Sequence, residues 1–274
     1  MRTKCAVLGS PIEHSLSPAL HLAAYEELGL SDWSYERHEM DEVGLPDFVR
    51  GRDASWRGLS LTMPLKVVAL GLGEVDPVAG LVGAANTLIF DDDGRRVFNT
   101  DVGGLVSAVR GGLGAGRGDL ATVVVLGTGA TARSTLASAA ELGAGRVIVV
   151  ARTPSRAEAL RPLALALGLR LDVQPWGSPL PAADLLVSTV TAGAADAVAA
   201  DAVAAAPIIF DVVYDPWPTA LASAAEHLGV AVLNGLDLLV GQAVLQVRLM
   251  TGRDIDPAVL MSAGRAELSR RAGA

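Results

Sequence analysis

The second half of the chain repeats one pattern, a short apolar run followed by a stretch with helical periodicity. The apolar runs are TVVVLG (122–127), RVIVVA (146–151), DLLVS (184–188), PIIFDVV (207–213) and VAVLN (230–234). Continuous apolar runs of this length are typical of strands that are buried on both faces of a parallel sheet. Strands that are joined through intervening helices predict a doubly wound α/β fold.

The first half is also expected to mix strands and helices, though less regularly. Its strands are expected at residues 4–9, 33–40, 57–62, 87–90 and 95–98, of which the last two form a hairpin. Helices of the whole chain are expected at 18–29, from Pro64, and at 101–111, 131–143, 236–250 and 256–273. A length of 274 residues suggests about two domains, and the five glycines of GGLGAGRGD (111–119) mark the best candidate for a linker.

The composition argues against several classes of protein. With a net charge of −8 and a pI near 5.0, the chain is a poor partner for nucleic acids or anionic membranes. The single cysteine, Cys5, excludes an intrachain disulfide framework and fits a reducing compartment. The apolar stretch near the N-terminus is too short for a signal peptide, and no apolar run reaches the length of a membrane span. We therefore expect a cytoplasmic protein.

The first apolar run of the second half leads into a glycine-rich turn. In VVVLGTGATARSTLA (123–137), Gly127, Gly129 and Ala132 follow the pattern G-x-G-x-x-A. Gly127 would form the tight turn, Gly129 would let a pyrophosphate approach a helix N-terminus, and Ala132 would let the helix pack closely on the strand. A strand before the motif and a helix after it are the context that a dinucleotide site requires. A plain structural turn is the alternative.

The end of the next strand discriminates between dinucleotides. An NAD site usually offers an acidic residue there, which binds the ribose hydroxyls. Here the strand runs into ARTPSR (151–156), which contains no acid but offers Arg152, Thr153 and Arg156. Two guanidinium groups and a hydroxyl suit a 2′-phosphate, so the sequence favours NADP over NAD. Thr153 followed by Pro154 is also a helix start, and the two roles are compatible.

Scarce residue types mark the polar clusters of the first half. The chain contains 20 arginines but only two lysines, Lys4 and Lys66. A lysine amine can give up its proton where arginine cannot, so Lys66 in SLTMPLK is a candidate for acid–base chemistry, although chance survival is the alternative. Asparagine is nearly as rare, and two of three asparagines lie in GAANT (83–87) and FNTD (98–101). These clusters predict a site for a small polar substrate.

A third cluster precedes the first expected helix. In GSPIEHSLSPALH (9–21), Ser15 and Ser17 flank Leu16, so on an extended segment the two hydroxyls would point the same way. Such a pair suggests a carboxylated or polyhydroxylated ligand. Ser17 alone could instead be a helix cap, because Pro18 follows it.

Together these motifs resemble the shikimate dehydrogenase family. The matching segments are GSPIEHSLSPALH (9–21), SLTMPLK (60–66), GAANT (83–87), NTD (99–101), GTGATA (127–132), ARTPSR (151–156), YDPWPTAL (214–221) and NGLDLLVGQA (234–243). They span most of the chain in an order and at a spacing similar to the family's, so the combination is more specific than any single motif.

The resemblance implies an α/β protein of two domains. Residues 1–101, completed by C-terminal helices in 236–274, would form the substrate-binding domain, and residues 102–235 would form a Rossmann-type NADP domain with a parallel sheet. The implied activity is the reversible, NADP-dependent reduction of 3-dehydroshikimate to shikimate, a step in chorismate and aromatic amino acid biosynthesis. The substrate would be a small molecule, and the protein would be a monomer or a homodimer.

The resemblance also carries roles to individual residues. Lys66 and Asp101 would be the catalytic pair. The positions implied for substrate binding are Ser15, Ser17, Thr62, Asn86, Tyr214 and Gln242. The positions implied for cofactor binding are Gly127, Gly129, Ala130, Ala132, Arg152, Thr153, Arg156 and Gly235. No metal is expected, because the four histidines and the cysteine show no ligand spacing.

Three departures and several alternatives accompany the resemblance. The family often has asparagine where Ser60 and Ala151 stand, and residues 186–193 are a loose version of a more polar family segment. The alternatives are a quinate/shikimate dehydrogenase that uses NAD, an aminoshikimate dehydrogenase, a non-catalytic ligand sensor on the same scaffold, and a folate-type methylene dehydrogenase. The ARTPSR segment argues against the enzyme that uses NAD. Retention of Lys66 and Asp101 argues against a sensor, and the pair of Ser15 and Ser17 argues against a folate-type dehydrogenase.

Overall fold

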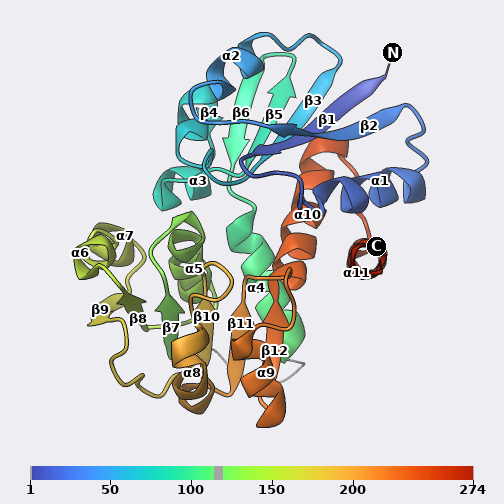
Figure 1. The fold of residues 1–274 in the computed structure, drawn as a ribbon. Coiled ribbons are helices and arrows are strands. Elements are labelled where there is room, and N and C mark those ends of the chain that lie inside the picture. Colours follow the sequence, from blue (N-terminus) through green and yellow to red (C-terminus); the bar gives the residue numbers. More distant parts are fainter. Residues whose placement is uncertain (1, 114–119, 274) are drawn as a thin grey trace. The chain divides into compact units, whose positions relative to one another are not determined.

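The computed structural model describes residues 2–113 and 120–273, and the chain divides into two compact units. Unit 1 comprises Met1–Gly104 and Leu239–Ala274, and unit 2 comprises Leu105–Leu238. The chain passes between the units within two helices, α4 (Asp101–Leu113) and α10 (Gly235–Thr251) (Figure 1). Residues 111–113 of the expected linker are therefore the last turn of α4, and residues 114–119 lie outside the described residues.

Unit 1 contains a mixed six-stranded sheet in the order β2-β1-β3-β5-β6-β4. Its strands are β1 (Thr3–Gly9), β2 (Trp33–Glu39), β3 (Trp56–Leu61), β4 (Glu74–Val75), β5 (Thr87–Asp91) and β6 (Gly94–Phe98). Strand β1 runs parallel to both β2 and β3, whereas β5 is antiparallel to β3 and β6. The expected hairpin is confirmed, since β5 and β6 pair antiparallel across a short turn.

Helices cover both faces of this sheet. They are α1 (Ser17–Glu27), α2 (Leu45–Arg50), the 3-10 helix η1 (Val68–Leu72), α3 (Pro77–Val82) and α11 (Pro257–Ala272), together with the ends of α4 and α10 that belong to unit 1. One core joins the sheet to α2 and α3 through Leu45, Val49 and Ala79. The other joins the opposite face to α1 and α10 through Tyr25 and Met250. The helix expected from Pro64 is instead a turn that precedes η1.

Unit 2 contains an all-parallel six-stranded sheet, as predicted from its apolar runs. Its strands are β7 (Thr122–Leu126), β8 (Arg146–Ala151), β9 (Arg170–Pro175), β10 (Leu185–Ser188), β11 (Ile208–Asp211) and β12 (Ala231–Asn234). Their spatial order is β12-β11-β10-β7-β8-β9, so the chain builds outward from β7 in one direction and then in the other. This is the doubly wound Rossmann order, whose switch point lies between β7 and β10.

The helices of unit 2 pack on both faces of the parallel sheet. They are α5 (Ala130–Glu141), α6 (Pro154–Glu158), α7 (Arg161–Ala166), the 3-10 helix η2 (Asp196–Val198), α8 (Ala199–Ala205) and α9 (Ala220–His227). One core contains residues of α4, α5 and α7, and the other contains residues of α8 and α9. In both cores the central strands contribute valines with almost no exposed surface, which is why their sequences are continuously apolar.

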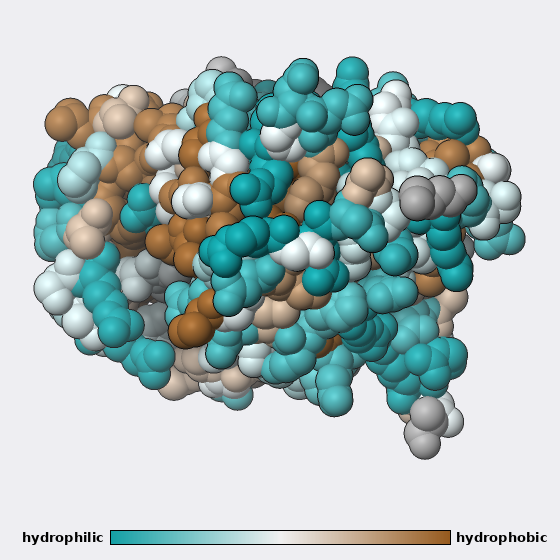
Figure 2. All heavy atoms as spheres, turned by 90° about the horizontal axis from the view of Figure 1, so that it is seen from above, coloured by the Kyte–Doolittle hydropathy of each residue, from teal (hydrophilic) through white to brown (hydrophobic). Residues whose placement is uncertain are grey.

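The surface is polar with local apolar areas. Hydrophobic residues gather toward the left of the face shown in Figure 2, whereas hydrophilic residues dominate its right side. Several large apolar side chains in unit 1 are exposed, among them Met63 at 60% and Val67 at 59%, which lie in the same turn as Lys66. Within residues 2–113 and 120–273, no helix combines the length and the apolar character that a membrane crossing would need.

Candidate active site

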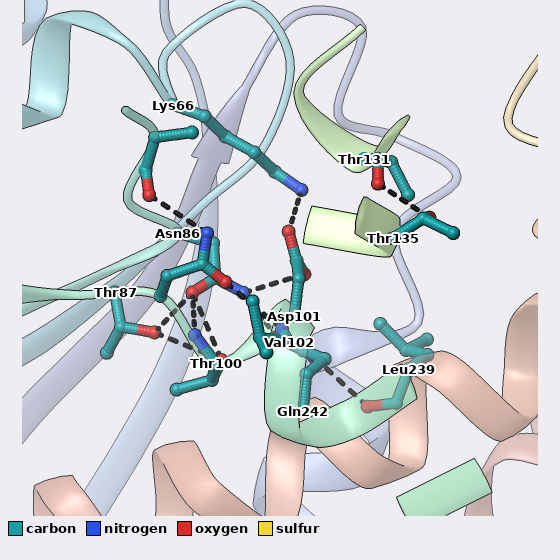
Figure 3. A network of polar contacts seen from close by, with 12 residues as sticks. Lys66, Asn86, Thr87, Thr100, Asp101, Val102, Thr131, Thr135, Leu239 and Gln242 are labelled. Carbon is teal, nitrogen blue, oxygen red and sulfur yellow. Dashed lines mark hydrogen bonds and ion pairs between the residues drawn. The ribbon is translucent and has the colours of Figure 1, made fainter. Parts of the chain in front are cut away.

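Lys66 and Asp101 form an ion pair in unit 1. Lys66 lies in the turn after β3, and Asp101 is the first residue of α4. Lys66 Nζ donates to Asp101 Oδ2 over 2.6 Å (Figure 3), and the two side chains are only 16% and 6% exposed. The position of the carboxylate at a helix start is favourable, because the free N–H groups there carry partial positive charge. The pair is thus held in a partly buried, low-dielectric setting.

The Asn86 side chain fixes the other oxygen of Asp101. Asn86 precedes β5, and its Oδ1 accepts the backbone N–H of Thr100 over 2.8 Å. Because that N–H can only donate, it determines which way the amide of Asn86 faces. Asn86 Nδ2 then donates to Asp101 Oδ1 over 2.8 Å and to Gln242 Oε1 over 3.3 Å (Figure 3). Asp101 therefore holds the amine with one oxygen and is oriented through the other.

Gln242 reaches this network because α4 and α10 pack with little separation. A Cβ on Gly104 would lie 2.7 Å from the backbone nitrogen of Gln242, and a Cβ on Gly241 would lie 2.6 Å from the carbonyl oxygen of Gly104. Only glycine permits such an approach between two helix backbones. Gln242 Nε2 donates to the carbonyl of Leu239, which leaves Oε1 facing Asn86.

A second glutamine on α10 supports Asn86 from behind. Gln246 is 0% exposed, and its Nε2 donates to the backbone carbonyl of Asn86 over 3.3 Å and to Thr87 Oγ1 over 3.0 Å. Since the carbonyl can only accept, the amide orientation is fixed and Oε1 faces the opposite side. There Oε1 accepts from Ser60 Oγ over 2.8 Å and faces His21 Nε2 over 3.2 Å.

The buried end of this network contains two aromatic rings. Tyr35 donates its hydroxyl to Ser60 Oγ over 2.6 Å, and its ring stacks on His21 with centroids 4.1 Å apart. Full burial lowers the pKa of His21 to about 4, so the ring is neutral near pH 7. Its Nε2–H donates to Gln246 Oε1, because that amide oxygen can only accept, and Nδ1 is buried without a hydrogen-bond partner among the described residues.

Sequence reasoning missed most of this inner network. Ser60 belongs to the polar cluster of SLTMPLK and is a departure from the family pattern, but neither observation predicts that its hydroxyl links Tyr35 to Gln246. Gln246 stands four residues after Gln242, and residues at that spacing share a helix face. That spacing was the available signal. His21 and Tyr35 gave no comparable signal, because their partners lie far away in the sequence.

The two serines adopt a geometry different from the one expected. The segment is not extended, because Leu16 has helical angles of φ −86° and ψ −10°. Leu16 is the N-cap of α1, so the alternative of Ser17 as the cap is wrong. The Ser17 backbone N–H donates to Ser15 Oγ over 3.3 Å. Ser15 is partly exposed and Ser17 is 4% exposed, with its hydroxyl near the Tyr35 phenol.

Thr62 directly follows β3, four residues before Lys66. Its backbone N–H donates to the carbonyl of Leu8 over 2.9 Å, and its residue is partly exposed. Thr62 therefore lies at the carboxyl end of the central strand β3, directly before the turn that carries Lys66.

In unit 2, the glycine-rich turn lies at the switch point of the parallel sheet. Gly127 has φ +109°, and a Cβ there would meet Thr189 Oγ1 at 2.5 Å. Gly129 is the N-cap of α5, and no described atom lies within 4 Å of the place where its Cβ would be. Ala130 is the first residue of α5, and Ala132 is fully buried in the core beneath it. The N-terminus of this twelve-residue helix is thus open to an anion.

The next strand ends in an exposed basic segment. Arg152, Thr153 and Arg156 are all exposed, whereas Ala151 is 4% exposed at the end of β8. Thr153 occupies the N-cap position of α6, as expected, but its side chain makes no capping bond. Among the described residues, neither arginine side chain has a hydrogen bond or ion pair. The two guanidinium groups are therefore available to a phosphate.

Gly235 packs against the loop that carries Tyr214. A Cβ on Gly235 would lie 2.1 Å from the carbonyl oxygen of Val212 and 3.0 Å from Cδ1 of Tyr214, so a side chain is excluded. The loop is anchored by Asp211 at the end of β11, which accepts the Thr219 hydroxyl over 2.8 Å. Burial raises the pKa of the Asp211 carboxyl, although the Thr219 hydroxyl opposes that rise.

Two family profiles match the chain. The one described as the shikimate dehydrogenase substrate binding domain matches residues 7–88, and the one described as the shikimate 5'-dehydrogenase C-terminal domain matches residues 235–263. A shikimate dehydrogenase (NADP(+)) of Methylobacterium radiotolerans is 40% identical over 250 residues, which cover 87% of each chain. The enzyme of the same name from Citrifermentans bemidjiense is 40% identical over 271 residues, or 92% of this chain and 91% of its own.

Solved structures agree with these matches. The shikimate dehydrogenase of Mycobacterium tuberculosis superposes with a TM-score of 0.89 at 41% identity, over 96% of this chain and 99% of its own. The enzyme from Thermus thermophilus, solved in complex with NADP(H) and shikimate, gives a TM-score of 0.81 at 35% identity, over 96% and 99% of the two chains. Sequence and structure agree across nearly the whole length, and the chain belongs to the shikimate dehydrogenase family.

Proposed function

We propose that Lys66 and Asp101 are the catalytic pair of an NADP-dependent shikimate dehydrogenase that interconverts 3-dehydroshikimate and shikimate. The protein is an oxidoreductase that acts on a CH–OH group of its substrate. The observation that carries the assignment of the pair is the 2.6 Å contact between the Lys66 amine and an Asp101 carboxylate that Asn86 holds through its other oxygen. The same contacts orient the amine before any substrate arrives.

Reduction of a ketone requires a hydride and a proton, and NADPH, when bound, supplies the hydride to the C3 carbonyl carbon. Negative charge then develops on the carbonyl oxygen. Lys66 stabilises this charge and delivers a proton from its ammonium group, which completes the alcohol. In the reverse direction the neutral amine accepts the hydroxyl proton. Asp101 keeps the amine aligned and accepts a hydrogen bond from a substrate hydroxyl.

The residues of unit 2 fit NADP. The pyrophosphate would lie at the N-terminus of α5, where Gly127 and Gly129 keep the backbone accessible and Ala130 begins the helix. The 2′-phosphate would contact Arg152, Thr153 and Arg156, whose side chains are exposed. The strand end holds no acidic residue that would repel a phosphate, which supports NADP over NAD.

The remaining assignments concern which residues bind the substrate and which bind the cofactor. Residues 1–101 with 236–274 would bind the substrate, and residues 102–235 would bind the cofactor. Ser15, Ser17, Thr62, Asn86 and Gln242 would hold the substrate's carboxylate and hydroxyls. Tyr214 would lie near the carboxylate, and Gly235 near the nicotinamide, where the absence of a side chain leaves room.

One assay tests this function against its nearest alternatives. Purified protein is mixed with shikimate and then with quinate, each with NADP and with NAD, and reduction is followed at the absorbance of the reduced nicotinamide. We expect turnover with shikimate and NADP that exceeds every other combination. Equal or faster turnover with quinate and NAD would assign the chain to the quinate/shikimate class. Binding of shikimate without turnover under any condition would indicate a sensor.

A further inference from the structure

Three consecutive backbone carbonyls in the segment that carries Ser15 accept hydrogen bonds from arginines. Arg37 Nη1 donates to the carbonyl of Glu13 over 2.6 Å. Arg271, from the last helix of the chain, donates to the carbonyl of His14 through Nη1 over 2.8 Å and to that of Ser15 through Nη2 over 3.3 Å. A single guanidinium group thus bridges two successive peptide units, which fixes their relative orientation.

Arg271 is itself held in place. Helix α11 packs against α1, and on α11 Glu267 Oε1 accepts from Arg271 Nε over 2.8 Å. The two side chains are only 19% and 17% exposed. Hydrogen bonds from Arg270 and Arg271 lower the pKa of the Glu267 carboxyl to about 2, so the acid stays ionised across the working range of pH. The Arg271 guanidinium is therefore held in one orientation between helix α11 and the loop at His14 and Ser15.

The loop that Arg271 holds determines where the serine hydroxyls lie. The Ser15 backbone N–H donates to the carbonyl of Ile12 over 3.0 Å, and Ser15 Oγ accepts the N–H of Ser17 over 3.3 Å. Arg271 bonds the peptide units on both sides of Ser15, so it restrains both backbone angles of that residue. A change in those angles would displace the Ser15 hydroxyl and break its bond to the Ser17 N–H. Small displacements of a binding group are costly, because a polar ligand is recognised by hydrogen bonds of narrow geometry.

We propose that Arg271 is a positioning residue for substrate binding, which clamps the loop at His14 and Ser15 and so places the Ser15 and Ser17 hydroxyls to receive the substrate carboxylate. This inference rests on the role proposed above for the two serines. It assigns a function in substrate recognition to the C-terminal helix, whose contact with the ligand would be indirect.

The chain supplies a matched control in the neighbouring residue. Arg270 binds the same carboxylate, Glu267, through Nε over 2.9 Å and Nη2 over 2.8 Å, and its side chain is 68% exposed. Arg271→Met and Arg270→Met therefore each remove one positive charge and one hydrogen-bond partner of Glu267. Only the first also removes the bonds to the loop. Arg271→Lys keeps the charge but loses the fork that bridges two carbonyls.

The kinetic test compares these variants in the full-length protein. We expect Arg271→Met to raise KM for shikimate about 3- to 10-fold, with kcat and KM for NADP within about twofold of the parent, since ground-state binding alone is affected. Arg271→Lys should give an intermediate value, and Arg270→Met should match the parent. Equal effects of Arg270→Met and Arg271→Met, or a fall in kcat with unchanged KM, would overturn the proposal.

Hydrogen exchange provides a readout that needs no substrate. In Arg271→Met, backbone amides in residues 10–17 should exchange faster than in the parent, while those of β1 should not change. In Arg270→Met the whole profile should match the parent. If exchange responds as expected but the parent does not oxidise shikimate, the clamp stands and the proposed function fails. If exchange in the loop is unchanged in Arg271→Met, the clamp is wrong whatever the enzyme's activity.

Discussion

The polar groups of unit 1 and those of unit 2 are prepared for their ligands in opposite ways. Around Lys66 and Asp101, the side chains are buried and bonded to one another, from Tyr35 through Gln246 to Asn86. At the end of β8, Arg152 and Arg156 are exposed, and within the described residues their guanidinium groups have no partner. The contrast suggests that the substrate is recognised by a geometry that exists beforehand, and the cofactor phosphate by charge.

Physical chemistry explains both arrangements. A buried polar group without a partner costs about 1–3 kcal/mol, which favours a network behind the active site in which most polar atoms are bonded; among the described residues, Nδ1 of His21 is an exception. Once bonded, it restricts the side chains to one geometry. An exposed guanidinium is solvated at no such cost, and it attracts a phosphate through an interaction that salt screens. Under the proposed function, the first arrangement would give specificity for shape, and the second would give specificity for charge.

The largest effect on turnover is expected when Lys66 or Asp101 is replaced, because the two residues are proposed to act as a unit. Lys66→Ala and Asp101→Asn should each lower kcat about 10²- to 10⁴-fold, the usual contribution of a general acid–base group. The double variant should lose far less than the product of the two single losses, because each partner works only in the presence of the other. The measurement is a double-mutant cycle in kcat with shikimate and NADP. Multiplicative losses would mean that the network does not join the two residues functionally.

The burial of His21 predicts a pH dependence of stability. Its pKa is about 4 in the folded protein against 6.5 in the unfolded chain, so the unfolded chain binds more protons between these values. The contribution of His21 is therefore complete above pH 6.5 and is lost as the pH falls toward 4. The free energy of unfolding should fall by about 3 kcal/mol across this window, at about 1.4 kcal/mol for each pKa unit.

Denaturant titrations at several pH values check this prediction. His21→Phe should unfold more easily at pH 7 but should show a much smaller further loss between pH 6.5 and 4. His227 is exposed on α9 and serves as the matched control, since His227→Gln should keep the slope of the parent. If His21→Phe keeps the full slope as well, the buried ring is not the group that titrates.

The smallest of the three effects is expected at the exposed arginines. Arg152→Ala or Arg156→Ala should raise KM for NADP about 10- to 150-fold at low salt, the equivalent of one charge-assisted hydrogen bond, with KM for shikimate nearly unchanged. Added salt should shrink the difference from the parent, because the contact is exposed. Arg161→Ala removes another exposed arginine of the same unit, one that pairs with Glu158, and should leave KM for NADP unchanged. Unaltered NADP binding in both test variants would assign the phosphate to other residues.

The sequence predicted the two regions to different degrees, for physical reasons. Strands buried on both faces need continuous apolar runs, so the four central strands of the parallel sheet were found. The edge strand β12 was found because its sequence, AVLN, is also mostly apolar, whereas the edge strand β9, with the sequence RLDVQP, mixes charged and apolar residues and was missed. Five helices were missed as well, because each has only six to eight residues, too few for a helical period to stand out; they are α2, α3, α7, α8 and α9. Element boundaries were otherwise close to those observed.

The candidate site shows the same limit. Lys66, Asn86 and Asp101 were singled out by rarity and by resemblance, and the structure brings them together with Gln242. Apart from Gln246, which shares a helix face with Gln242, the inner network could not be predicted, because its bonds join residues as distant as His21 and Gln246, which are 225 positions apart. The helical conformation of Leu16 could not be predicted either, because the backbone of its loop is bound by Arg271 from the last helix of the chain.

The central claim is that Lys66 takes part in proton transfer within a geometry built beforehand, and Lys66→Arg tests it most directly. Arginine keeps the positive charge that could still pair with Asp101, but its wide planar group does not readily give up a proton. The measurement is kcat for shikimate oxidation with saturating NADP, with circular dichroism to confirm the fold. We predict a loss of kcat nearly as large as that of Lys66→Ala. A Lys66→Arg enzyme with near-parental kcat would contradict the account, because charge alone would then suffice at this position.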